Sequence, residues 1–118
     1  MVTVLFALFL VAHGAVHVIM FALPYDDQAR EDLPFNPANS WLLGEAQAPG
    51  LAFATIVTAA FAIAAAGFAI RAAWWEEATL IAAGLSLVLL LLFFNVWWTA
   101  GYLISLTLAA VTWRLQVT

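Results

Sequence analysis

The sequence contains no cysteine and no lysine, and charged residues make up only 8% of its 118 positions. The absence of cysteine excludes disulfides, thiolate metal sites, iron–sulfur clusters and thiol catalysis. The three arginines are scattered along the chain, so they form no basic patch that would hold nucleic acid phosphates. We therefore expect no nucleic acid binding and no cysteine-based chemistry.

Apolar residues make up 67% of the sequence, and the mean hydropathy is +1.06. That share exceeds the usual value for a soluble domain, and too few charges remain to cover a water-facing surface. An apolar helix needs about 20 residues to cross the hydrocarbon core of a bilayer. The length therefore allows at most four crossings and one real loop, in a single all-α membrane domain.

Four apolar runs predict an antiparallel bundle of four transmembrane helices. Pro24 ends the first run, because proline disfavours helix at the residue before it. A secretory signal peptide is the alternative for this run, but no Lys or Arg precedes it and no clear small-x-small cleavage site follows. The expected helices are residues 2–23, 50–70, 78–94 and 101–115, and residues 24–49 form the loop.

The arginines also predict an orientation. With four crossings, Arg71 and Arg114 share one side of the membrane with the N-terminus, whereas Arg30 lies in the acidic loop on the other side. Positive residues favour the cytoplasmic side. We therefore expect a multi-pass protein of the cytoplasmic (inner) membrane, surrounded by lipid, with both termini in the cytoplasm and the acidic loop facing out.

The two histidines of the chain, His13 and His17, both lie within the first apolar run. Residues four apart share one face of a helix. Counted back from Pro24 at about 1.5 Å per residue, His17 lies about 10 Å and His13 about 16 Å beneath the outer end of the run. Ionisable groups at such depth normally face a bundle interior or a wet cavity, so the pair is expected to point inward.

The same depth count places hydroxyl residues of the other helices near the histidines, among them Ser105 and Thr107, and places polar and aromatic residues at the outer rim. We therefore expect a polar pocket that opens outward beneath the acidic loop. Its predicted ligand-binding residues are His13, His17, Glu45, Thr55, Thr58, Ser86, Asn95, Trp98 and Tyr102.

Three other interpretations of the histidine pair stay open. The histidines can simply join helices by hydrogen bonds to Ser, Thr or backbone groups. They can bind haem or a transition metal, although two ligands complete no metal site, and residues on one helix face cannot take both axial positions of one haem iron. A titrating histidine can also serve a proton-coupled small-molecule transporter, which with four helices requires a homodimer.

Two stretches resemble small bacterial four-helix membrane proteins, broadly the DoxX-like proteins. One is His13-Gly14-x-x-His17, and the other runs from Gly67 through Trp74-Trp75 to Leu85-Ser86-Leu87. The resemblance implies a four-helix bundle in the cytoplasmic membrane that partners other membrane or redox proteins. It transfers no catalytic residue. Small multidrug transporters match in helix count, but they depend on a carboxylate in the first helix, where this chain has only histidine.

The leading hypothesis is a non-enzymatic membrane protein. In this hypothesis, the histidine-lined cavity binds a small apolar or amphiphilic ligand, or a partner subunit in a homodimer or larger membrane complex. The alanine-rich run at residues 50–70 contributes a second surface, since small residues let membrane helices approach closely. No serine shows the surroundings of a catalytic nucleophile.

Overall fold

The computed structural model describes residues 1–22, 39–40, 42–93 and 99–117. Four helices make up most of this part of the chain, which confirms the prediction of an all-α protein with four helices. A two-residue antiparallel ladder precedes the second helix. The elements are α1 (Val2–Ala22), β1 (Asn39–Ser40), β2 (Gly44–Glu45), α3 (Gln47–Ala69), α4 (Trp75–Leu92) and α5 (Thr99–Val117).

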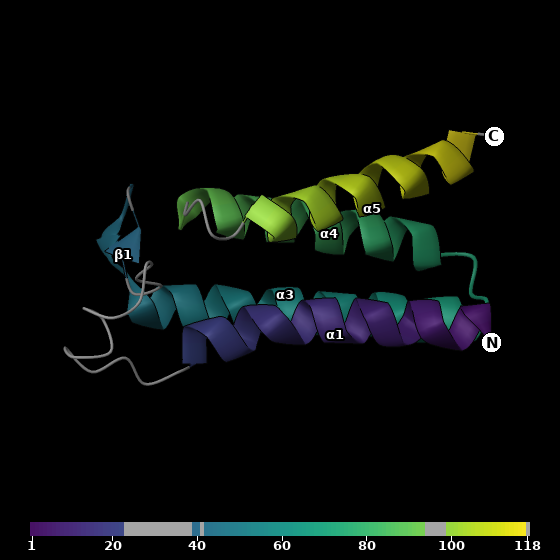
Figure 1. Ribbon diagram of the computed structural model, residues 1–118, viewed down its shortest axis with the longest axis horizontal. Coiled ribbons are helices and arrows are strands. Elements are labelled where there is room, and N and C mark those ends of the chain that lie inside the picture. Colours follow the sequence, from purple (N-terminus) through teal and green to yellow (C-terminus); the bar gives the residue numbers. More distant parts are fainter. Residues whose placement is uncertain (23–38, 41, 94–98, 118) are drawn as a thin grey trace.

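Each helix packs mainly against the next one along the chain: α1 against α3, α3 against α4, and α4 against α5. Figure 1 shows α1 and α3 side by side and α4 and α5 together above them, with both termini at the same end of the molecule. The molecule is elongated along the helices, at 48 × 24 × 21 Å.

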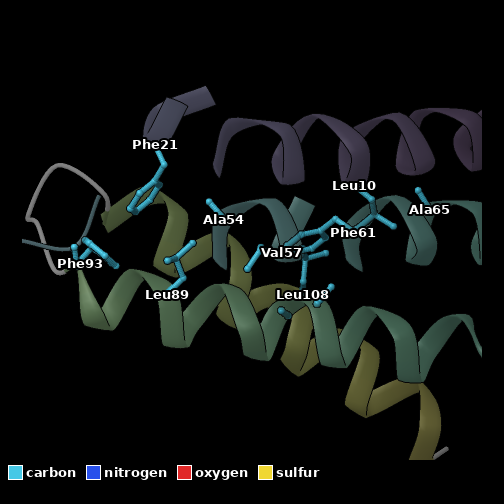
Figure 2. Close-up of a cluster of buried hydrophobic side chains, with 12 residues drawn as sticks. Leu10, Phe21, Ala54, Val57, Phe61, Ala65, Leu89, Phe93 and Leu108 are labelled. Atoms are coloured by element: carbon cyan, nitrogen blue, oxygen red, sulfur yellow. The ribbon is translucent and has the colours of Figure 1, made fainter. Parts of the chain in front are cut away.

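The core runs along the centre of this arrangement and contains side chains from all four helices (Figure 2). Leu10, Val57, Phe61 and Leu89 are completely buried. The outer surface is also apolar, and the large hydrophobic residues exposed on it include Val16, Ile56, Ile63, Ile81, Val88, Leu103, Leu106 and Val111. Among the described helices, α1, α3 and α4 are long and apolar enough to cross a membrane.

Glycine lets aromatic rings pack closely between helices at three levels of the structure. A Cβ atom built on Gly14 would lie 2.6 Å from Cβ of Phe61, on the neighbouring helix. Gly67 lies against the Trp74 ring in the same way, and Gly50 lies against Phe93 and a second phenylalanine ring, that of Phe21. These positions therefore have no room for a side chain.

Three helices begin earlier than predicted, and one of them is α5, which starts at Thr99 instead of residue 101. α3 starts at Gln47, so Pro49 lies in its first turn, where the missing backbone N–H would have no intrahelical partner. α4 starts at Trp75 and includes Glu76 and Glu77 in its first turn. Carboxylates are stabilised at this end by the positive pole of the helix dipole, which explains why the charged residues extend the helix.

The short ladder is held to the end of α4 by Ser40. The Ser40 hydroxyl donates a hydrogen bond to the backbone carbonyl of Leu92 and accepts bonds from the backbone N–H groups of Leu42 and Leu43. Gly44 follows with a φ of 76°, a left-handed conformation that glycine adopts at little cost. The ladder therefore lies at the C-terminal end of α4.

Candidate functional site

The candidate site is a hydrogen-bonded cluster formed by His13, His17, Ser86 and Ser105, which we call the His–Ser cluster. Both histidines lie on the inward face of α1, where their exposed fractions are 8% and 6%. Both serines are completely buried, one in α4 and one in α5. The sequence prediction that the histidines share one face and point inward is therefore confirmed.

Three hydrogen bonds link the side chains of the cluster. Nε2 of His17 lies 2.7 Å from Oγ of Ser86, and Oγ of Ser86 lies 2.8 Å from Oγ of Ser105. Nε2 of His13 lies 3.2 Å from the same Ser105 oxygen. The main packing partner of α1 is α3, so the cluster adds polar links from α1 to α4 and α5.

A fourth hydrogen bond fixes the direction of all the others. Nδ1 of His17 lies 2.9 Å from the backbone carbonyl oxygen of His13, which can only accept. In a neutral imidazole one nitrogen donates and the other accepts. Nδ1 of His17 therefore donates, and its Nε2 accepts the hydroxyl proton of Ser86.

The remaining protons follow in sequence. Ser86 has given its only proton to His17, so it accepts the proton of Ser105. Ser105 donates its only hydroxyl proton to Ser86, so it accepts a hydrogen bond from Nε2–H of His13. The chain runs from His13 through the two serines to His17, and each step has one donor and one acceptor. All its partners are uncharged, as a neutral imidazole in an apolar interior requires.

Aromatic rings enclose the histidines within the bundle. The Phe61 ring meets His13 edge-on at 5.0 Å between centroids and lies 6.0 Å from His17. The Phe9 ring lies parallel to the His13 imidazole at 6.0 Å. Phe9 is 42% exposed, whereas Phe61 is fully buried, so Phe9 separates His13 from the outer surface.

An open apolar groove of about 240 Å³ lies beside the cluster, between α1 and α5. It is lined by Phe9, Leu103, Ile104, Thr107 and Leu108. The Thr107 hydroxyl donates to the carbonyl of Leu103 at 2.7 Å, so it offers the groove little free polarity. The groove adjoins the cluster on the α1 side, because Phe9 lines the groove and stacks on His13.

The structure brings some of the other predicted site residues near the histidines and places others elsewhere. The Thr58 hydroxyl donates to the carbonyl of Gly14 at 2.7 Å and therefore bridges α3 and α1 beside the cluster. Thr55 is exposed and donates to Leu51 of its own helix. The Tyr102 hydroxyl donates to the carbonyl of Leu90, and so links α5 to α4.

Three predicted rim residues have no described side chain. Glu45 belongs to β2, but only its backbone is described. Asn95 and Trp98 lie outside the described residues. The outer lid of the predicted pocket therefore stays a prediction.

The described part of the chain holds no group of three His, Cys, Asp or Glu residues placed to bind a metal ion. Nε2 of each histidine is instead engaged with a serine hydroxyl. A metal or haem bound at Nε2 of either histidine would have to replace a hydrogen bond of the cluster. The geometry thus favours hydrogen bonding as the task of both Nε2 atoms.

The residues that line the groove, other than Thr107, were absent from the sequence-based prediction. Apolar side chains on an apolar helix carry no signal that distinguishes a groove from a lipid-facing surface. Ser105, by contrast, was expected at the level of the histidines from the depth count. Its hydroxyl partner, Ser86, could also be predicted, because a hydroxyl side chain is conspicuous in an apolar run.

Comparison with known proteins finds no matching family model, no matching curated protein and no matching solved structure. The resemblance to DoxX-like proteins therefore stays a prediction based on the short stretches that suggested it.

Proposed function

We propose that this chain is a small integral protein of the cytoplasmic membrane that binds the apolar chain of an amphiphile in the groove between α1 and α5. Its helices form an antiparallel four-helix membrane bundle with both termini in the cytoplasm. The apolar outer surface and the three helices of spanning length support the membrane setting. α5 completes the bundle as a fourth crossing, with Arg114 in its last turn at the cytoplasmic surface.

The observation that carries the binding proposal is the groove itself. Its volume of about 240 Å³ falls below the 300–1,000 Å³ of typical drug-sized ligand pockets. An open groove of that size, lined mostly by apolar side chains, suits a single hydrocarbon chain better than a fused ring system. In a bilayer such a groove opens to the surrounding acyl chains, so an amphiphile reaches it by lateral diffusion.

The His–Ser cluster holds the helices that form the groove in position. It holds α1 against α4 and α5 at the depth of the groove, through bonds from His13 to Ser105 and from His17 to Ser86. Polar bonds between membrane helices contribute modest stability, about 0.6 kcal/mol each on average. Several linked bonds at one level nevertheless fix how α1 and α5 face each other. In this proposal the histidines position the wall of the site.

Photolabelling in a bilayer tests the proposal. The protein is placed in phosphatidylcholine nanodiscs and exposed to a diazirine-bearing alkyl alcohol, and labelled residues are mapped by mass spectrometry. We expect labelling at the groove-lining residues that unlabelled 1-decanol displaces to saturation. The variant Ile104→Trp fills the groove and should reduce the displaceable labelling about tenfold, equivalent to about 1.4 kcal/mol.

The matched control is Ile63→Trp, which places the same bulky ring on the exposed surface of α3, where Ile63 is 57% exposed. This variant should keep the labelling of the parent protein. Labelling that does not saturate, or that both variants leave unchanged, would contradict a binding groove. Covalent dimers on cross-linking, with no labelling by the probe, would instead show that a second copy of the chain fills this surface.

A further inference from the structure

We propose that the groove selects amphiphiles whose headgroup donates a hydrogen bond, such as a hydroxyl, and that Nδ1 of His13 accepts it. This inference rests on the proposed function and specifies its ligand class. It follows from the direction of the hydrogen bonds in the His–Ser cluster and from the position of His13 behind Phe9.

The direction of the cluster leaves one lone pair without a proton or a partner. The chain that starts at the carbonyl of His13 requires Nε2 of His13 to carry the proton that Ser105 accepts. A neutral imidazole has one proton on its two nitrogens. Nδ1 of His13 is therefore an acceptor, and no side chain or backbone group among the described residues donates to it.

Such an acceptor is costly where it lies. His13 is only 8% exposed, and a buried acceptor without a donor loses its bonds to water without replacement. The corresponding nitrogen of His17 is satisfied by a backbone carbonyl 2.9 Å away. The two imidazoles thus differ in one respect: the His17 ring is engaged at both nitrogens, and the His13 ring at one.

The unsatisfied imidazole adjoins the groove. Phe9 lines the groove and lies parallel to the His13 ring, and it is the half-exposed residue between that ring and the surface. Rotation of the Phe9 ring opens a path from the groove to His13. A hydrocarbon chain in the groove then places a headgroup at the imidazole, in a region where no water competes for the bond.

An acceptor selects for donors. A hydroxyl donates a hydrogen bond to Nδ1, whereas an ether or ketone presents a second lone pair and leaves the acceptor unsatisfied. A carboxylate or phosphate would add a buried charge with no cation among the partners of the cluster. Neutral alcohols are therefore the favoured class, and hydrogen bonds of this kind in membranes predict a preference of about threefold.

Competition between two matched probes tests the inference. In the photolabelling experiment, 1-decanol and 1-methoxydecane are compared as competitors, since they share the hydrocarbon chain and differ in the donor. We expect 1-decanol to displace the label at about one third of the concentration that 1-methoxydecane requires. In His13→Phe, which keeps an aromatic ring without nitrogen, the two competitors should become equivalent.

A second measurement uses the unmodified sequence, in case His13→Phe fails to fold. The ¹⁵N resonance of His13 Nδ1, recorded in labelled protein in bilayers, should move when 1-decanol is added and stay in place with 1-methoxydecane. Equal displacement by both competitors, together with an unmoved resonance, would overturn the headgroup inference and leave the groove intact. Absence of saturable labelling with any alkyl probe would overturn the proposed function, and this inference with it.

Discussion

Gly14 is the residue at which the two most closely packed helices leave no space for a side chain. Its carbonyl accepts a hydrogen bond from Thr58, and Cβ of Phe61 lies only 2.6 Å from the position that a Cβ atom on Gly14 would take. Gly14 also sits on the same helix between His13 and His17. Any change that separates α1 from α3 here would therefore shift the histidines away from their serine partners.

Gly14→Ala is expected to destabilise the protein by about 1–3 kcal/mol, the usual cost of forcing extra volume into a packed interior. The added methyl would meet Cβ of Phe61 at 2.6 Å, a position fixed by the α3 backbone. Unfolding in mixed micelles, followed by titration with a denaturing detergent, measures the change.

Gly84→Ala is the control, because a Cβ atom there has no neighbour within 4 Å. This substitution should leave the stability unchanged or raise it by about 0.5–1 kcal/mol through helix propensity. Equal losses for both variants would show that the loss at Gly14 does not come from its contact with Phe61, and that α1 and α3 do not approach as described.

One hydrogen bond between α1 and α3 has a close counterpart that lies entirely within α3. The Thr58 hydroxyl donates to Gly14 on α1 and to Ala54 on its own helix, whereas the Thr55 hydroxyl donates only to its own helix, at Leu51. The two threonines differ in whether the bond crosses between elements. They offer a matched comparison on one helix.

Thr58→Val should weaken the α1–α3 contact by about 0.6 kcal/mol, the average for such bonds in membranes. Valine keeps the shape of threonine and removes only the hydroxyl. Thr55→Val removes a hydroxyl that never leaves α3 and should change the free energy of unfolding by less. If both variants lose the same amount, the bond to Gly14 contributes nothing to the pairing.

Depth along a helix could be predicted from the sequence, but rotation about its axis could not. The depth count placed Ser86 and Ser105 in layers that overlap those of the two histidines, and the structure joins all four side chains. Thr55 was expected at the same level, yet it faces outward. Helices that are apolar on all sides, as α3 is, give no polar face from which to read the rotation.

Helix ends were predicted only to within a few residues. Charged and proline residues were taken as loop, but Pro49 and Glu76 fit the first turns of α3 and α4. The four helices themselves were correct because long apolar runs are the strongest signal in such a sequence. The groove was missed, since it depends on how two apolar surfaces diverge.

Across the whole molecule, contacts between helices lie at three levels. Near the first turns of α1, the Phe6 ring lies 4.6 Å from that of Phe68 and 6.5 Å from that of Trp75. At the opposite end, Phe21 meets Phe93 at 4.9 Å. The His–Ser cluster occupies the level between them. Aromatic contacts therefore hold both ends, and directed hydrogen bonds hold the centre.

Solid-state NMR of ¹⁵N-labelled protein in lipid bilayers determines whether His13 and His17 are opposite tautomers in one hydrogen-bonded chain. The donors and acceptors come from α1, α4 and α5, so the result requires the assembled molecule. Sequential correlation to Gly14 and Val18 assigns the two rings. We expect a proton on Nε2 of His13 and on Nδ1 of His17, with both imidazoles neutral. Two identical tautomers, or two charged rings, would contradict it.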